Sequence, residues 1–164
     1  MKLAKKMQDA LNEQIKHELY SAYLYLSMSH YCESHNLPGT AKWLRMQWSE
    51  EQSHAMRLMD YVSRRGGQVA LAAIEKPPAE FGTLLNLFEQ VLKHEESISA
   101  KIHKLYEAAA AARDHAMTTE LQWFLSEQVE EEQNAGQVVD TLKLIGDNRP
   151  GLFMLDRQLG ERQE

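Results

Sequence analysis

Cysteine is nearly absent from this sequence, because Cys32 is the only one among 164 residues. A disulfide framework within the chain is therefore excluded, and a reducing compartment is consistent with the composition. No uninterrupted run of about 18 apolar residues occurs, so no membrane span is expected. The opening residues, MKLAKKMQDALNEQ, turn polar too early for a secretory signal peptide. Together these absences predict a cytoplasmic protein without a membrane partner.

A basic surface is also lacking. The 18 lysines and arginines are outnumbered by 24 aspartates and glutamates, which gives a formal net charge of -6. Nucleic-acid binding generally needs a basic face, so no nucleic-acid partner is expected, whereas the negative charge suits the attraction of cations. Hydrophobic residues make up 43% of the chain, as in ordinary globular proteins, and the length predicts a single domain over residues 1–164.

Proline is scarce, and helix-forming residues dominate the sequence. The four prolines and several glycines fall in short clusters that mark turns, such as Pro38-Gly39, Arg65-Gly66-Gly67 and Pro77-Pro78. Between these clusters the apolar residues recur at intervals of three and four. The sequence predicts four long helices and a short final one, over residues 5–34, 40–65, 83–111, 115–145 and 151–160.

The long connection over residues 66–82 determines how the helices are arranged. Its 17 residues reach at most about 55 Å when extended, and a helix of the length predicted for 40–65 is on the order of 40 Å long. The connection can therefore run the length of a bundle and leave the second and third helices parallel, while short turns make the other neighbours antiparallel. This pattern predicts an all-α four-helix bundle with one long crossover.

Each long helix has an apolar stripe that one polar side chain interrupts near its middle. The interrupting residues are Glu18, Glu51, Glu95 and Gln128. Glu18 and Glu51 are 33 residues apart, and so are Glu95 and Gln128. Since the midpoints of both intervals fall at predicted turns, each pair is expected to lie level in an antiparallel hairpin. The two predicted hairpins therefore repeat the same pattern of polar residues.

One helical turn further on, His54 follows Glu51, and Glu131 follows Gln128. A single such acid could be protonated or face solvent on a rotated helix. Several buried carboxylates at one level need a counter-charge, and few basic residues lie on these stripes. Carboxylate, imidazole and amide ligands suit a hard or borderline metal ion. The arrangement follows the di-iron bundle plan, except that Gln128-x-x-Glu131 replaces one Glu-x-x-His, and Glu51 is expected to bridge two ions.

Four segments in this order resemble the bacterial non-haem ferritins over nearly the whole chain. They are LNEQIKHELYSAYLY (11–25), WSEEQSHAMRLMDYV (48–62), KHEESI (93–98) and LQWFLSEQVEEEQ (121–133). The resemblance implies a ferritin-like bundle with a short C-terminal fifth helix. It also implies a ferroxidase centre in which Glu18 and His54 bind the first iron, Glu51 bridges, and Glu95 binds the second iron with Gln128 nearby.

The same resemblance assigns roles to two aromatic residues and to a third iron site. Tyr25 would be an electron donor beside the iron pair, or alternatively a core residue with a bonded hydroxyl. Trp123 is either a further redox neighbour or simply packed. The third site would consist of Glu50, Glu127, Glu130 and Glu131, although Glu130-Glu131-Glu132 alone could be a solvated acidic face. Glu132 is expected to be a surface residue.

Several related alternatives can be tested on the sequence. Haem is not expected, because Gln52 stands where bacterioferritins carry the haem-binding methionine. One cysteine excludes a rubrerythrin-like iron module. Thr118 and Leu121 stand where animal ferritins carry channel carboxylates, so the sequence lacks the acidic residues of that entrance. The remaining histidines lie off the stripes and are expected at the surface: His17, His30, His35, His94, His103 and His115.

The function implied by the resemblance is iron storage. The protein would oxidise Fe(II) to Fe(III) with O2 or peroxide and keep the product as a ferric mineral inside a shell of 24 identical subunits. The alternative is a di-iron, peroxide-detoxifying redox protein without bulk storage. A third possibility is a structural helical bundle that binds no metal.

Overall fold

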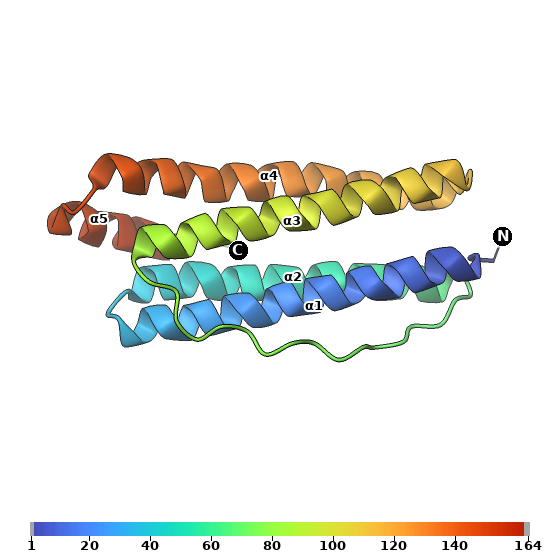
Figure 1. Ribbon diagram of the computed structural model, residues 1–164, viewed down its shortest axis with the longest axis horizontal. Helices are drawn as coiled ribbons and strands as arrows, with labels where there is room; N and C mark the ends of the chain where they lie inside the picture. The colour runs from blue at the N-terminus through green and yellow to red at the C-terminus, as the bar shows by residue number, and fades with distance from the viewer. Residues whose placement is uncertain (1, 163–164) are drawn as a thin grey trace.

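The computed structural model describes residues 2–162, and within them it contains five helices and no strand. The helices are α1 (Lys5–Ser34), α2 (Pro38–Arg64), α3 (Leu84–Ala111), α4 (His115–Ile145) and α5 (Arg149–Gly160). Figure 1 shows α1 antiparallel to α2 and α3 antiparallel to α4, with α5 at one end of the bundle. The predicted all-α bundle with a short fifth helix is confirmed. In the described part of the chain, no helix has the length and hydrophobicity to cross a bilayer.

The connection between α2 and α3 runs along the bundle and makes these two helices parallel (Figure 1). Side chains of α1 hold it in place at both ends. Near its start, Asn12 donates to Gln68 O at 3.1 Å and accepts from the amide of Ala70 at 3.2 Å. Near its end, the Tyr31 hydroxyl donates to Gly82 O at 2.7 Å. The long crossover predicted from its length is therefore an ordered strap over α1.

The helix ends differ from the prediction where proline is involved. Both α2 and α5 begin two residues earlier than expected, because Pro38 and Pro150 lie in the first turn. Proline fits there, since the first amides of a helix need no partner within it. The start of α3 is set by a capping box in which Thr83 accepts from the amide of Asn86 and the Asn86 side chain accepts in return.

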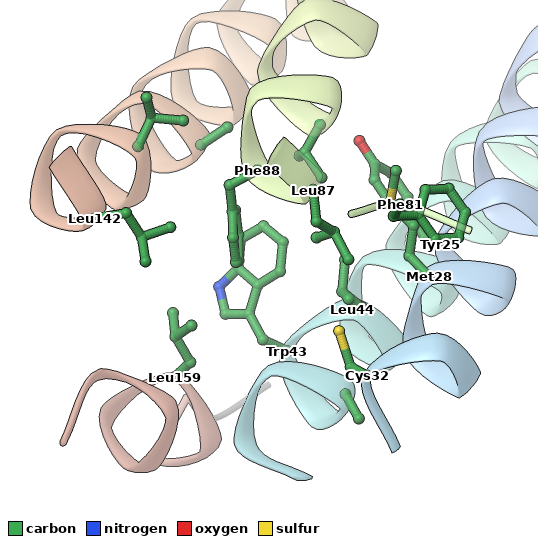
Figure 2. Packing of buried hydrophobic residues seen from close by; sticks show 14 of the residues in the cluster. Tyr25, Met28, Cys32, Trp43, Leu44, Phe81, Leu87, Phe88, Leu142 and Leu159 are labelled. Carbon is green, nitrogen blue, oxygen red and sulfur yellow. The ribbon is translucent and has the colours of Figure 1, made fainter. Parts of the chain in front are cut away.

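The core consists of two apolar clusters at opposite ends of the bundle. One includes Leu11, Ile15 and Phe124 and lies toward the start of α1. The other lies toward α5, and Figure 2 shows the Trp43 indole packed against Phe88 with residues of α3, α4 and α5 around it. Between the clusters, each long helix contributes its polar stripe residue. The core is thus divided by a polar layer at mid-height.

Helix α5 is fastened to the start of α2 by a buried aspartate. Asp156 accepts hydrogen bonds from the amides of Gly39 and Thr40, at 3.0 and 2.8 Å, and from the Thr40 hydroxyl at 2.7 Å. It therefore caps a helix whose own N-cap residue supplies no side-chain bond. The two backbones are so close that a Cβ atom built on Gly39 would lie 1.7 Å from Asp156 O. Glycine is required at this contact.

Candidate metal centre

A polar layer crosses the bundle between the two apolar clusters, with side chains from all four long helices. None of its six members is more than 4% exposed: Glu18 of α1, Glu51 and His54 of α2, Glu95 of α3, Gln128 and Glu131 of α4. The antiparallel pairing of α1 with α2 and of α3 with α4 brings these positions to one level. Six residues singled out from the sequence therefore share one buried region.

Three members of the layer form an open cage of ligand atoms. A carboxylate oxygen from each of Glu18 and Glu51 and a ring nitrogen of His54 lie within 4.8 Å of one another. His54 Nδ1 is 3.5 Å from Glu51 Oε2 and 4.0 Å from Glu18 Oε2. These separations are long for hydrogen bonds. They suit ligands that surround one ion, since two atoms each about 2.1 Å from a metal lie roughly 3 to 4 Å apart.

The cage atoms lack partners within the protein. In residues 2–162, the buried side-chain atoms without a hydrogen bond are Glu18 Oε2, both carboxylate oxygens of Glu51, and His54 Nδ1. Leaving such an atom unpaired costs about 1–3 kcal/mol. Burial, followed by the charges of Glu18 and Glu95, raises the pKa of Glu51 well above its ordinary value. A cation bound here would offset the clustered negative charge and give these atoms a partner.

Glu95 lies in the same layer but has partners for both oxygens. Its Oε1 accepts from the Tyr25 hydroxyl, and its Oε2 accepts from Gln128 Nε2 at 3.1 Å. Burial raises the pKa of Glu95 to about 7, although the hydrogen bonds from Tyr25 and Gln128 act in the opposite direction. Glu95 is therefore held by neutral donors, whereas the cage carboxylates of Glu18 and Glu51 present free oxygens.

His54 also faces a second group of acids. A ring nitrogen of His54 and carboxylate oxygens of Glu127 and Glu131 lie within 4.8 Å of one another. Nε2 is 3.9 Å from Glu127 Oε1, while Nδ1 faces the cage. Burial, and then the charge of Glu95, raise the pKa of Glu131 to about 8. The imidazole thus stands between two sets of potential ligands.

The other two acids expected at a third iron site lie outside this group. Glu130 is exposed to solvent. Glu50 is half-buried, and both of its carboxylate oxygens accept hydrogen bonds from Arg162 Nη2, at 2.8 and 2.9 Å. The structure therefore brings together half of the expected set, and it places Glu50 in an ion pair that was not predicted from the sequence.

Two buried glutamines, also not predicted, donate hydrogen bonds to the layer. Gln14 Nε2 donates to Glu18 Oε1 at 2.7 Å, and Gln47 Nε2 donates to Glu131 Oε2 at 2.8 Å. Each glutamine stands four residues before a stripe carboxylate, Gln14 before Glu18 and Gln47 before Glu51. That repeated Gln-x-x-x-Glu spacing is a signal from which both could have been identified.

The expectation that His94 lies at the surface is wrong. Its ring is half-buried between α3 and α1, where Nε2 is 2.7 Å from Ser21 Oγ. It packs edge-on against Tyr25, with 5.9 Å between ring centroids and an interplanar angle of 89°. Burial, and then the charge of Lys101, lower the pKa of His94 to about 4. A position beside the stripe is covered here because α3 contacts α1 as well as α4.

Trp123 borders the cage through its packing. Its ring lies edge-on to the His54 imidazole, with 5.3 Å between centroids and an angle of 81°. The Arg57 guanidinium lies 4.1 Å from the centroid of the indole and donates to Glu120 Oε1 at 2.7 Å. These contacts restrict the plane of the imidazole, so Trp123 orients a candidate ligand.

We expect the metal-free protein to lose stability as the pH rises from about 6.5 to 8.5. Because the pKa values of Glu95 and Glu131 are raised to about 7 and 8, the folded state keeps protons that the unfolded state has released. The free energy of unfolding falls with pH in that case, by on the order of 2 kcal/mol. His94 acts in the opposite direction, mainly below about pH 7.

Thermal unfolding of the metal-stripped protein, followed by circular dichroism, measures this effect. The unfolding temperature should be lower at pH 8.5 than at pH 6.5, and added Zn2+ should restore it. Glu131→Gln should flatten the profile, since its amide does not titrate. An unfolding temperature that rises over the same interval would show that these carboxyls are ionised in the metal-free fold.

Comparisons with known proteins agree with the helical fold described above. The family model described as "Ferritin-like domain" matches residues 8–145. A bacterial non-heme ferritin of Bacteroides fragilis is 42% identical over 98% of this chain and 99% of its own length. The Escherichia coli O157:H7 protein of the same name is 40% identical over 96% and 95%. An open pore ferritin from the archaeon Archaeoglobus fulgidus superimposes with a TM-score of 0.97 at 48% identity, covering 98% and 99% of the two chains.

Proposed function

The chain belongs to the ferritin family, and from that premise we propose that it is a ferroxidase that oxidises Fe(II) and stores the ferric product inside a shell of identical subunits. Iron is thus its substrate and its cargo. The observation that carries the proposal is the cage of Glu18, Glu51 and His54, with its unpartnered buried atoms. Family and fold support iron storage and oxidation in general, and the cage is where this chain would begin them.

The first iron would bind in the cage. Glu18 and His54 supply one ligand each, and Glu51 has two free oxygens with which to bridge to a second ion. Carboxylates are hard ligands, so they favour the more highly charged Fe(III) over Fe(II) and make oxidation easier. Two neighbouring Fe(II) ions deliver two electrons together, which reduces O2 to peroxide or peroxide to water, with two protons taken up in either case.

The second iron would bind at Glu95 with Gln128 nearby. There the carboxylate is already engaged by Tyr25 and Gln128, and an amide stands where the full di-iron plan has a stronger ligand. We therefore assign weaker binding to this position. Weak binding suits a substrate that must leave after oxidation better than it suits a permanent cofactor.

Tyr25 would serve as an electron donor to the iron pair. Its hydroxyl donates to Glu95, and burial followed by the charge of Glu95 raises the pKa of Tyr25. The phenol therefore stays protonated before oxidation. When it gives up an electron, its proton has a direct acceptor in the Glu95 carboxylate.

The third iron would bind at Glu127 and Glu131, beside the imidazole that also serves the cage. Glu50 and Glu130 would complete this site. Their side chains lie at and near the surface of α2 and α4, so the third site is the more open of the two regions. It would receive iron on its way between the buried pair and the mineral.

Storage requires a cavity between subunits, because the interior of the single bundle is filled by its two apolar clusters and the polar layer. Three large apolar side chains are exposed at the α5 end: Leu144, Phe153 and Met154. Uncovered apolar surface of this kind favours association. A shell of 24 copies, with α5 at a symmetry axis, is the assembly that the bacterial ferritins imply.

Size-exclusion chromatography with light scattering, followed by Fe(II) addition in air, tests this proposal. A particle of shell size that develops ferric absorbance rapidly and keeps many irons per subunit soluble is the expected result. A dimer that oxidises two irons per subunit and stores no more would replace storage by a peroxide-detoxifying redox function. A protein without any response to Fe(II) would overturn the ferroxidase assignment.

A further inference from the structure

A path of hydrogen bonds runs from the end of α5 to the polar layer. Arg162, two residues beyond α5, donates through Nη1 to Gln47 Oε1. Gln47 in turn donates from Nε2 to Glu131 Oε2 at 2.8 Å. Nη2 of the same guanidinium donates to both oxygens of Glu50. One side chain therefore contacts one proposed third-site carboxylate directly and reaches another through a glutamine.

Several contacts hold Arg162 in this position. Its guanidinium carbon lies 5.1 Å from the centroid of the Trp43 ring, which belongs to the apolar cluster near α5. Leu159, one turn earlier, is buried in the same cluster, and Figure 2 shows it beside the Trp43 indole. The side chains of Arg162 and Glu50 are 24% and 37% exposed, so bulk water screens their attraction only partly. Arginine is favoured here, since its planar group donates to two partners in fixed directions.

We infer that Arg162 is a built-in counter-cation that competes with iron for Glu50 and thereby limits occupancy of the third iron site. This inference rests on the proposed function. With the guanidinium in place, both Glu50 oxygens are engaged, and Glu50 lies outside the cluster formed by His54, Glu127 and Glu131. Iron can recruit Glu50 only when Arg162 withdraws.

The competition has a direct consequence for iron movement. Because binding of iron and binding of the arginine to Glu50 exclude each other, each weakens the other by the same factor. Arg162 returns to Glu50 as iron leaves, so the carboxylate is never left without a cation. The third site thus acts as a brief stop for iron, and Arg162 keeps it from holding iron permanently.

A redox-inert metal separates this effect from catalysis. Zn2+ is titrated calorimetrically into the assembled wild-type protein, Arg162→Gln and the control Arg157→Gln, which removes an exposed arginine of α5. The weakest Zn2+ site should bind about five- to tenfold more tightly in Arg162→Gln, the range expected for losing one well-oriented, partly buried competitor. Arg157→Gln should match wild type within about twofold. Arg162→Lys, which keeps the charge but loses the two-partner geometry, should fall between.

A double-mutant cycle tests whether the gain in Zn2+ affinity depends on Glu50. In the Glu50→Gln background, Arg162→Gln should no longer change the affinity of the weakest site. If Arg162 only fastened α5, its replacement would lower the unfolding temperature and leave Zn2+ binding unchanged or weaker, and that result would overturn the inference. A gain that persists without Glu50 would overturn it too. If the wild-type protein bound no Zn2+ at all, the proposed function itself would be rejected. Failure of the inference and failure of the proposed function are therefore distinguishable.

Discussion

Glu51→Gln is expected to reduce the rate of Fe(II) oxidation at least about 100-fold and to leave the metal-free fold as stable as wild type or more stable. Loss of a residue that merely supports a metal ligand costs 10–100-fold, and Glu51 would be a ligand to both irons. Its two buried oxygens have no hydrogen-bond partner, so this carboxyl group costs stability in the metal-free fold. The neutral amide keeps the volume and removes an ionisable group whose burial is costly, which would stabilise the fold by about 1–2 kcal/mol.

The measurement pairs ferric absorbance after Fe(II) addition with thermal unfolding of the metal-stripped protein at pH 8. Glu96→Gln is the matched control, because it makes the same chemical change outside the layer. Glu96 is an exposed acid on α3, next to Glu95. A variant that oxidises iron at the wild-type rate would remove Glu51 from the centre. A variant that unfolds more easily would show that the carboxylate has a structural partner.

The arrangement of the four helices could be predicted from the length of the connection over residues 66–82 and from the glycines at its ends. Seventeen residues between two glycine-bounded helix ends can span a bundle, and that reach determines that α2 and α3 run parallel. The helix ends could be predicted less closely, because proline both interrupts helices and begins them. Pro38 and Pro150 were therefore expected before their helices, whereas each lies in a first turn.

The level of the polar layer could also be predicted, since it depends on two equal intervals of 33 residues. The residues that surround and support this layer could not be predicted, because their roles depend on contacts between helices. Gln47 lies one position from the predicted stripe of α2, yet its amide reaches across to Glu131 on α4. His94 lies beside the stripe of α3, and only the proximity of α1 buries it. Sequence periodicity identifies which face is inward, but not which side chains at the edge of that face are covered.

The docking of α5 had no signal in the sequence. Asp156 caps α2 from 116 positions beyond Thr40 in the sequence, and its other partner, Gly39, is a residue type that also marks ordinary turns. The position of Arg162 beside Glu50 depends on that docking. Such a contact becomes visible only when the fold is known, which is why the third site was predicted as four acids without their cation.

Gly39→Ala is expected to detach α5 and to destabilise the protein by roughly 3–5 kcal/mol. The new methyl group would lie 1.7 Å from Asp156 O and 2.6 Å from its carbonyl carbon, and neither backbone atom can move alone. Separation of the helices would break the hydrogen bonds that Asp156 accepts from Gly39 and Thr40 and would expose Leu155 and Leu159. Overpacking, lost caps and exposed leucines each contribute to a loss of this size.

Gly136→Ala is the matched control, because a methyl group on Gly136 of α4 would meet no atom within 4 Å. Alanine is the better helix former, so this variant should be as stable as wild type or up to about 1 kcal/mol more stable. Thermal unfolding and light scattering on both variants make the comparison. Since α5 carries the exposed Phe153 and Met154, Gly39→Ala should also lower the yield of shell-sized particles, whereas Gly136→Ala should not.

The two glycine variants also test whether Zn2+ binding in the cage depends on the docking of α5. The cage residues Glu18, Glu51 and His54 lie on α1 and α2 at mid-height, away from the α5 contact, so Zn2+ binding in the cage should survive Gly39→Ala in any folded fraction. Detaching α5 also removes Arg162 from Glu50, so the weakest Zn2+ site should tighten as it does in Arg162→Gln. If Gly39→Ala assembles and unfolds like wild type, the close contact between α2 and α5 is not a feature of the protein in solution, and the position of Arg162 loses its support.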